Sequence, residues 1–330
     1  MERIDAHFHV LGDDPGTVAL LGELGIRALN VCVAHDGWSG SVRPGFRALS
    51  RAHPDRYAWC TTFDLPDYTV PDGEYQRSVT AGLARDLRDG AVAVKAWKHI
   101  GMELRRRDGS FAMVDDGVFT PVFEFLENEG VPLLTHIGEP LACWQPLDTP
   151  SAHAGYYRSH PEWHFHGRPG VPAHAELIRA RDQVLARHPK LRVVGAHLGS
   201  LEYDVTEVGA RLERFPGFAV DLSARLGDLM LQDREKVRGF FIRYQDRLLF
   251  GTDLVSTRPL SSLESAERDR IHGTIRSSYE TWFRYLESDE IVHTGAQATQ
   301  GLDLPRDVVE KVCSANARVW YPRLAQQPAP

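Results

Sequence analysis

The stretch Asp5–Val10, with the sequence DAHFHV, stands close to the start of the chain and has the character of a buried strand that carries two imidazoles. Alternate side chains of a strand share a face, so His7 and His9 point the same way and Phe8 points to the other side. Neutral imidazole nitrogens are common ligands of zinc and other divalent metals. The pattern therefore predicts a first strand that supplies part of a metal site, with the other ligands at the ends of other strands.

Composition indicates a globular protein that acts on a small molecule. The 330 residues are 42% hydrophobic and 25% charged, which is ordinary for a chain with a substantial core. A net charge of −7 argues against nucleic acid and anionic membranes as partners. The four cysteines are widely spaced, so reduced thiols are expected. We find neither a signal peptide nor an apolar run near the roughly 20 residues that span a bilayer, and we expect a cytoplasmic protein.

Short apolar runs alternate with longer helical patterns, which predicts parallel βαβ units. Strands are expected at 3–10, 26–34, 57–64, 91–98, 132–138, 192–198, 218–224 and 248–254. Helices are expected near 16–24, 42–53, 74–89, 118–130, 173–189, 204–215, 232–246 and 262–287. Eight such pairs are the count of a TIM barrel, so the predicted fold is α/β, a single (β/α)8 barrel. A doubly wound open sheet is the alternative, but residues 11–16 form no Gly-rich phosphate loop.

Residues 1–322 are expected to form one barrel domain, with a bracing helix near 305–320 and a disordered tail at 323–330. Two connections exceed ordinary loop length. Residues 99–117, after the fourth strand, contain an Asp-Gly pair that predicts a small hairpin. Residues 139–172, after the fifth strand, are rich in Trp, Tyr, His and Pro. Both follow C-terminal strand ends, where barrel enzymes build their sites, and we interpret the second as a lid.

Three further strands end in a side chain that can bind a metal, namely His136, His197 and Asp253. Each alone has an ordinary structural explanation, such as capping of the next helix by Asp253. Together with the first strand, they place metal-binding groups on four strands, whose C-terminal ends meet at one rim of a barrel. The sequence therefore predicts a metal site at that rim.

The direction of these side chains is predicted from strand parity. Gly195 and Gly251 stand two residues before His197 and Asp253, whereas the alternate positions carry bulky residues such as Phe250. A crowded barrel interior takes small residues, and the surface under the helices takes large ones. We therefore expect His197 and Asp253 to point toward the barrel axis.

This set resembles the amidohydrolase superfamily, in particular the branch that includes aminocarboxymuconate semialdehyde decarboxylase and related hydrolases and decarboxylases. The resemblance spans essentially the whole chain and includes the phrases GAHLG at 195–199, GTD at 251–253 and NAR at 316–318. It implies a homodimer and one divalent metal, for which Zn²⁺ is the best candidate and Mn²⁺ or Fe²⁺ would also fit. The ligands that it implies are His7, His9, His136 and Asp253.

The same resemblance implies that Asp253 acts as general base and that His197 orients or polarises the attacking water or the substrate. The physical chemistry agrees, because a divalent metal activates water and a neighbouring carboxylate shuttles its proton. The leading hypothesis is a hydrolase that cleaves an amide, ester or lactone bond of a small carboxylate-bearing molecule. The alternative is a metal-dependent decarboxylase of an aromatic or enol acid. An inactive binding protein is a third hypothesis, but the ligand set is complete.

Buried polar residues on other strands leave alternatives open. Lys95 lies on the small-residue face of the fourth strand and is expected to point inward. The resemblance allows a carboxylated lysine that bridges two metals and recruits His136 and His197 to the second. We favour a single metal, with Lys95 as a cation that holds a substrate carboxylate. Lys98 is expected at the mouth or in solvent, and Asp221 has inward parity with a structural hydrogen bond as its ordinary role.

Further substrate contacts are expected from the loops. Trp144 can stack on a flat substrate, although packing within the loop explains it equally well. Arg225 and Arg258, just past the seventh and eighth strands, are placed to bind a substrate carboxylate with two N–H groups, or to form surface ion pairs. Glu139 follows the predicted ligand His136 and is expected to support it or to assist acid–base chemistry.

Overall fold

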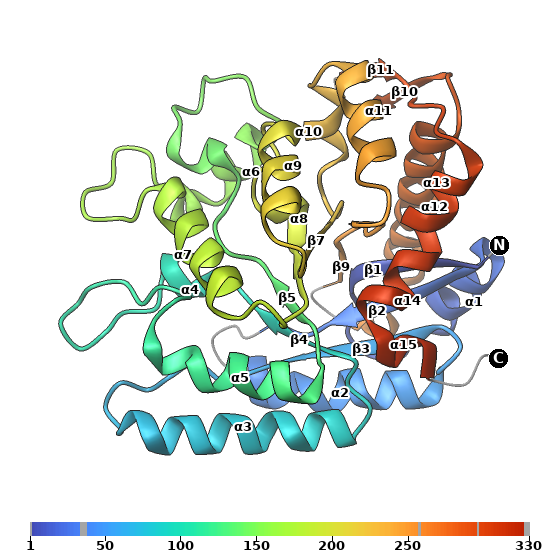
Figure 1. The fold of residues 1–330 in the computed structure, drawn as a ribbon. Coiled ribbons are helices and arrows are strands. Elements are labelled where there is room, and N and C mark those ends of the chain that lie inside the picture. The colour runs from blue at the N-terminus through green and yellow to red at the C-terminus, as the bar shows by residue number, and fades with distance from the viewer. Residues whose placement is uncertain (1, 34–37, 257–258, 296, 327–330) are drawn as a thin grey trace.

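A computed structural model describes residues 2–33, 38–256, 259–295 and 297–326. Within these ranges, nine parallel strands form one curled sheet in the order β8-β7-β6-β5-β4-β3-β2-β1-β9 (Figure 1). The strands are β1 (Arg3–His9), β2 (Ile26–Val31), β3 (Tyr57–Thr62), β4 (Ala93–Ala96), β5 (Leu133–Thr135), β6 (Val193–Gly195), β7 (Phe218–Asp221), β8 (Leu248–Leu249) and β9 (Leu254–Val255). The predicted α/β class with a parallel sheet is confirmed.

The long helices pack around the outer face of this sheet, and short helices lie at its ends (Figure 1). They are α1 (Pro15–Leu24), α2 (Trp38–Ala52), α3 (Asp72–Arg88), α4 (His99–Met102), α5 (Thr120–Glu129), α6 (Ala154–Ser159), α7 (His174–Arg187), α8 (Ala196–Gly199), α9 (Val205–Arg214), α10 (Leu226–Met230), α11 (Arg234–Arg243), α12 (Ser265–Glu287), α13 (Arg306–Glu310), α14 (Asn316–Trp320) and α15 (Pro322–Gln326). Short 3₁₀ turns lie at η1 (Gly117–Phe119), η2 (Leu141–Trp144), η3 (Pro161–Trp163) and η4 (Leu260–Ser262), and η5 (Lys311–Ala315) is a π-helical turn. Among the described residues, no helix combines the length and apolar character needed to cross a bilayer.

Local sequence signals set several helix limits. The carboxylate of Asp14 accepts a hydrogen bond from the Thr17 backbone N–H and so caps the start of α1. Gly25 and Gly130 end α1 and α5 with φ of 64° and 62°, a left-handed conformation that glycine adopts without steric cost. These glycines send the chain directly into the next strand.

The eighth predicted strand, 248–254, is found as two short segments. β8 pairs with β7, and β9 pairs with β1. Between them, the Ala6 N–H donates to the Phe250 carbonyl and the Asp253 N–H donates to the His7 carbonyl, both at 2.8 Å. Asp253 has φ of 59°, so a regular strand cannot pass through it. The segment therefore connects both edges of the curled sheet, and the count is nine strands where eight were predicted.

The inner face of the sheet carries small apolar side chains, as expected for a crowded interior. Its buried cluster includes Ala6, Ala58, Ala93, Ala196 and Ala219 from five strands or strand ends, together with Trp320, Tyr321 and Leu324 from the C-terminal helices. Leu324 is fully buried in α15, so the ordered chain passes the boundary predicted at residue 322. Residues 327–330 of the predicted tail lie outside the described residues.

The parity argument holds for one glycine and is wrong for the other. A Cβ on Gly251 would lie 3.1 Å from the Cβ of His7, so this position does face the interior. A Cβ on Gly195 would lie 2.7 Å from the Phe218 ring, which belongs to the outer cluster, whereas Val194 belongs to the inner one. β6 therefore has the opposite phase from the prediction, and Gly195 is small because an outer helix-side ring approaches it.

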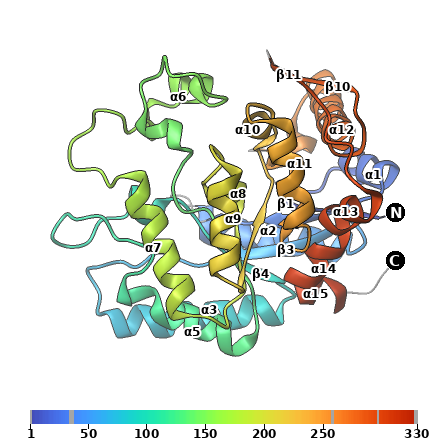
Figure 2. The same cartoon turned by 45° about the horizontal axis from the view of Figure 1, so that its top comes forward.

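Long connections follow β4 and β5. In the first, Arg105 and Phe111 form an antiparallel bridge, and Gly109 has φ of 82°, which gives the predicted hairpin. The second contains η2, α6 and η3, and we call its residues 139–172 the lid (Figure 2). The antiparallel hairpin of β10 (Ile291–Thr294) and β11 (Gln297–Gln300) was not predicted. The predicted bracing helix is divided into α13, η5 and α14.

Candidate metal centre

His7, near the end of β1, is held in one tautomer by an aspartate from β7. Its Nδ1 lies 2.9 Å from Asp221 Oδ2, and an ionised carboxylate oxygen can only accept, so the hydrogen sits on Nδ1. The Nε2 atom of neutral His7 therefore carries a lone pair. Metal-binding histidines typically donate a hydrogen bond to a carboxylate or carbonyl from the ring nitrogen that does not bind the metal.

His9 and Asp253 complete a group of three close donors. The Nδ1–H of His9 donates to the Val31 carbonyl at 2.6 Å, so its Nε2 also carries a lone pair. Oδ1 of Asp253 lies 3.1 Å from that Nε2 and 3.6 Å from Nε2 of His7. Two lone pairs facing a carboxylate repel unless a cation or a proton lies between them. The donors of His7, His9 and Asp253 all lie within 4.8 Å of one another, which fits a single divalent metal.

His197 approaches the same point from β6 through a left-handed turn. Its φ is 59°, and its backbone N–H donates to Asp221 Oδ1 at 2.9 Å, which holds the turn. The ring centroid lies 4.9 Å from that of His7. Nδ1 lies 2.9 Å from the Ser223 carbonyl, so the hydrogen again sits on Nδ1 and the Nε2 lone pair is free for other partners. This turn compensates for the opposite phase of β6.

His136 lies beside this group without belonging to it. Its ring centroid is 4.3 Å from that of His197, and its buried Nε2 has no hydrogen-bond partner in the described part of the chain. A buried polar atom without a partner is costly, and a metal ligand is one resolution of that cost. The structure thus brings His7, His9 and Asp253 together and leaves His136 adjacent to them. We call these four residues and His197 the metal centre.

A second close group, made of His7, His197 and Asp221, has another explanation. Asp221 accepts from the His7 ring and from the backbone N–H groups of His197 and Ser223. The hydroxyl of Ser223 lies 3.0 Å from Nδ1 of His7 and 2.9 Å from Nδ1 of His197. These atoms are committed to one another, so Asp221 and Ser223 orient the ligands from behind. No local pattern in the sequence marks Ser223 for this role.

Burial and neighbouring charges give the donors the protonation states that a metal requires. Burial lowers the pKa of His7, and for His136 and His197 it holds the pKa well below the usual value. Burial alone would raise the pKa of Asp253, but attraction to His197 and His7 when these rings carry a proton, together with the hydrogen bond with His9, outweighs burial and holds the pKa well below the usual value. Neutral imidazoles and an ionised carboxylate form the donor set that Zn²⁺ and related ions take.

Asp5 ties the strand that carries the histidines to the segment that carries Asp253. This fully buried carboxylate accepts from the Thr252 hydroxyl at 2.5 Å, the Tyr279 hydroxyl at 2.8 Å and the His7 backbone N–H at 3.0 Å. Burial raises the pKa of Asp5 to about 6, although these hydrogen bonds lower it. These hydrogen bonds link the strand that carries His7 and His9 to the segment that carries Asp253 and to α12.

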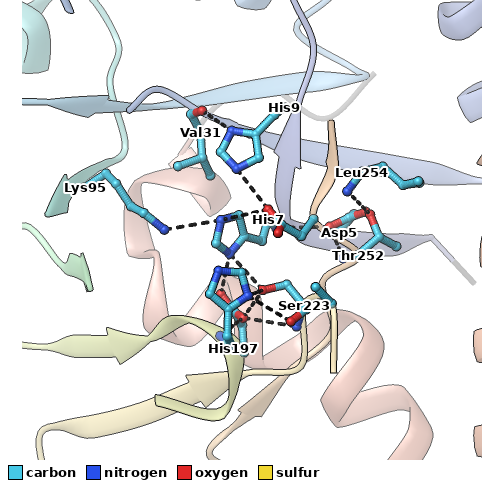
Figure 3. Close-up of polar contacts among 12 residues, drawn as sticks. Asp5, His7, His9, Val31, Lys95, His197, Ser223, Thr252 and Leu254 are labelled. Carbon is cyan, nitrogen blue, oxygen red and sulfur yellow. Dashed lines mark hydrogen bonds and ion pairs between the residues drawn. The ribbon is translucent and has the colours of Figure 1, made fainter. Parts of the chain in front are cut away.

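Lys95 points inward from β4, on the same face as Ala93 of the inner cluster. Its Nζ lies 3.2 Å from the Nε2 of His7 (Figure 3). Burial lowers the pKa of Lys95 to about 8, although the carboxylates of Asp221 and Asp253 raise it. The amine thus reaches the centre itself.

Lys98 was expected at the mouth or in solvent, and this prediction is wrong. Only 5% of the residue is exposed, its ammonium forms an ion pair with Glu139, and it lies 3.7 Å from the centroid of the Trp163 ring. β4 ends at residue 96, so strand parity no longer applies at 98. The other oxygen of Glu139 accepts from the Tyr157 hydroxyl at 3.1 Å, so both carboxylate oxygens of Glu139 serve to hold the lid.

The structure places two of the other residues that were predicted to contact the substrate, Trp144 and Arg225. The indole N–H of Trp144 donates to the Pro172 carbonyl at 2.8 Å, which is packing within the lid. Arg225 is buried just past β7, and one of its terminal N–H groups donates to the Ala224 carbonyl at 2.9 Å. Arg258 lies outside the described residues.

Comparison with known proteins supports the fold and the family. The sequence model of the amidohydrolase family matches residues 45–323. A search of curated proteins found no match. Similar solved structures include a TIM-barrel protein of uncharacterised function from Bordetella bronchiseptica, 16% identical with a TM-score of 0.58, covering 98% of this chain and 100% of that chain.

Two further solved structures carry descriptions of an activity. 2,6-Dihydroxybenzoate decarboxylase from Rhizobium is 16% identical, with a TM-score of 0.56 and coverage of 98% of this chain and 99% of that chain. A protein from Pseudomonas putida, provisionally assigned as 2-pyrone-4,6-dicarboxylic acid hydrolase, is 15% identical, with a TM-score of 0.54 and 98% coverage of both chains. At these identities the likeness shows a shared fold only.

Proposed function

Because this chain belongs to the amidohydrolase family, we propose that it is a metal-dependent enzyme that hydrolyses an amide, ester or lactone bond of a small carboxylate-bearing molecule. The observation that carries the proposal is the convergence of two imidazole lone pairs on one ionised carboxylate, at His7, His9 and Asp253. Family membership supports an enzyme and leaves the reaction open between hydrolysis and decarboxylation.

One divalent metal would be held by Nε2 of His7, Nε2 of His9 and the carboxylate of Asp253, with the unpartnered Nε2 of His136 as the fourth donor. Three imidazoles and a carboxylate suit Zn²⁺ best, and Mn²⁺ and Fe²⁺ accept the same set. When bound, such an ion lowers the pKa of water to about 7 and polarises a carbonyl group.

The chain's own residues would carry the proton transfers. Asp253 is ionised, and 24% of its side chain is exposed, so it can accept a proton from the attacking water and return it to the leaving group. His197 has no hydrogen on Nε2 in its neutral form, so it orients water by accepting a hydrogen bond. Lys95 has three N–H donors, which would hold the substrate carboxylate.

The cations around the centre support a carboxylate-bearing substrate. Lys95 and Arg225 are both buried, and the Nε of Arg225 has no hydrogen-bond partner in the described part of the chain. Buried cations that lack full pairing favour an anionic ligand. The substrate carboxylate would bind between them.

Decarboxylation of an aromatic acid is the second candidate, and the aromatic residues of the lid favour it. Tyr156 is 41% exposed, and its ring centroid lies 5.9 Å from the ammonium of Lys98. Two of the similar structures are named for carboxylated six-membered rings. In this reaction, an acid group at the centre would deliver a proton to carbon instead of accepting one from water.

The test begins with metal analysis of protein purified without chelator. We expect about one divalent ion per chain, loss of activity with a chelator and recovery with Zn²⁺ or Mn²⁺. 2-Pyrone-4,6-dicarboxylate and 2,6-dihydroxybenzoate serve as first substrates, because ring opening and release of carbon dioxide separate the two reactions. Full turnover after complete removal of the metal would overturn the proposal.

A further inference from the structure

Arg225 is presented to the metal centre by a strained turn directly after β7. Ala224 has φ of 54°, a left-handed conformation that is unfavourable for alanine, and the Arg225 N–H donates to the Leu222 carbonyl at 3.1 Å. The side chain of Arg225 is buried, with 6% of its surface exposed. Arg225 follows Ser223 by two residues, and the Ser223 hydroxyl contacts the rings of both His7 and His197, so this turn lies beside the centre.

The guanidinium is backed by a carboxylate that the catalytic residues do not use. Oδ2 of Asp228, three residues further along α10, lies 3.9 Å from Nε of Arg225. Both oxygens of Asp228 are also contacted by Nε2 of His153 in the lid, at 3.0 and 2.9 Å. Because the carboxylate accepts, His153 donates from Nε2. The contacts form a chain from the lid, through Asp228, to the cation beside the centre.

The lid docks on α10 at this place and leaves little room. A Cβ on Gly227 would lie 3.2 Å from the Cβ of Ala152 in the lid and 3.2 Å from Oε1 of Gln297 in β11. α10 lies between α6 and the β10–β11 hairpin in both views (Figures 1 and 2). The close approach at Gly227 fixes the neighbouring His153 against Asp228.

We propose that His153 and Asp228 are positioning residues that hold the Arg225 guanidinium for the carboxylate of the substrate, so that the docked lid completes the anion site. This inference rests on the proposed function, which assigns the carboxylate to Arg225. A planar guanidinium binds a carboxylate through two N–H groups only when its plane is fixed. His153 holds Asp228 by hydrogen bonds, Asp228 attracts the guanidinium as an ion pair at 3.9 Å, and the Nε–H of Arg225, which makes no hydrogen bond to the described residues, is left for the ligand.

Binding of benzoate to the Zn²⁺-loaded protein, measured by calorimetry with benzamide as the uncharged probe, tests this arrangement. His153→Ala and Asp228→Asn are each expected to weaken benzoate binding about tenfold, because the Arg225 guanidinium loses the ion pair that orients it, with less than a twofold effect on benzamide. His153→Gln, whose amide N–H can still donate to Asp228, should recover part of the loss. His160→Ala is the matched control, because His160 is an exposed lid histidine that pairs with Glu162.

The outcomes separate this inference from the proposed function. If Arg225→Met loses benzoate binding but His153→Ala binds it as the wild type does, the positioning role is wrong and the anchor stands. If Arg225→Met binds benzoate normally, the anchor itself is wrong and both fall. Any turnover assay adds a split that a purely structural role would not give, since KM should rise about tenfold while kcat is retained. His153 is only partly buried, so His153→Ala keeps the test available if Asp228→Asn fails to fold.

Discussion

The metal centre and the lid are both rich in histidine and aromatic residues, but they are held in opposite ways. At the centre, the Nδ1 atoms of three imidazoles are fixed by Asp221 or by the backbone carbonyls of Val31 and Ser223, and the strands behind them are linked through Asp5. The lid, in contrast, packs the side chains of Cys143, Tyr157, Trp163 and Phe165 into the main hydrophobic cluster and adds side-chain pairs such as Lys98 with Glu139. On the proposed function, strands β1–β9, which we call the frame, hold the catalytic groups, and the lid would contact the substrate.

Backbone strain follows the same division. Left-handed non-glycine residues occur at the C-terminal ends of β6, β7 and β8, at His197, Leu198, Ser200, Ala224 and Asp253. Within the described chain, none occurs in residues 139–172. Strained residues persist where the surrounding structure holds them, and they gather at active sites. The centre therefore holds strained non-glycine residues, whereas the left-handed residues of the lid are Gly167 and Gly170.

The largest effect is expected from Asp253→Asn, which removes the charge but keeps a residue that tolerates the left-handed backbone. Loss of the proton acceptor should lower kcat/KM about 1,000-fold, and metal content should fall with it. Asp303→Asn is the matched control, because Asp303 is an exposed aspartate that is also left-handed, with φ of 45°. If the activity of Asp253→Asn stayed within tenfold of the wild type, the role of Asp253 as proton acceptor and metal ligand would be wrong.

Asp221→Asn tests the hydrogen bonds that orient His7 and His197. The amide keeps one oxygen but replaces the other with a donor, so the His7 ring or the His197 backbone N–H loses its acceptor. We expect metal affinity to fall 10- to 100-fold, about the effect known for partners behind metal ligands, measured by competition with a chelator. Asp116→Asn is the control, because Asp116 pairs with Arg106 on the hairpin. Unchanged metal affinity in Asp221→Asn would mean that the tautomer is fixed by other contacts.

The sequence predicted the long strands and helices well, because their apolar residues recur with the period of the element. β1 was expected at 3–10 and is found at Arg3–His9, and α12 was expected at 262–287 and is found at Ser265–Glu287. The residues predicted as ligands do end their strands at one place, because parallel strands must finish at the same edge. Three of the four predicted ligand donors lie within 4.8 Å of one another.

The parts that were missed depend on contacts without a local signal. The phase of β6 was wrong because the size of Gly195 is set by Phe218, a residue 23 positions further along. The burial of Lys98 depends on Glu139 and on aromatic rings of the lid, which no strand pattern reveals. Side-chain pairs between distant segments are chosen by the folded geometry, so sequence parity fails where a strand ends.

Acid stability offers a third test, at the boundary between the lid and the frame. His174 is buried at the start of α7, donates from Nε2 to the Ser200 carbonyl at 2.8 Å, and burial lowers its pKa to about 4. The unfolded chain binds this proton near pH 6.5 and the folded chain does not, so stability falls as the pH falls from 6.5 toward 4. The loss from this one group between pH 7 and pH 5 is about 2 kcal/mol.

His174→Gln should therefore lose less stability than the wild type over that range, by about the same 2 kcal/mol, in urea unfolding at the two pH values. His166→Gln is the control, because His166 is an exposed lid histidine whose Nδ1 contacts the Trp144 carbonyl. An identical pH dependence in His174→Gln and the wild type would show that protonation of His174 does not contribute to the loss of stability in acid, and that other buried imidazoles cause it.

The smallest effect, and the sharpest test of the division, is expected from Trp144→Phe. The substitution keeps an aromatic ring but removes the N–H that donates to Pro172, so stability should fall by about 1 kcal/mol. KM should change less than twofold, because the indole is committed to the lid's own packing. Tyr156→Leu is the comparison, since that ring is exposed near Lys98 and its loss should raise KM for an aromatic substrate. A tenfold rise in KM for Trp144→Phe at unchanged stability would place the indole against the substrate and make the whole lid, not only its exposed ring, part of the binding site.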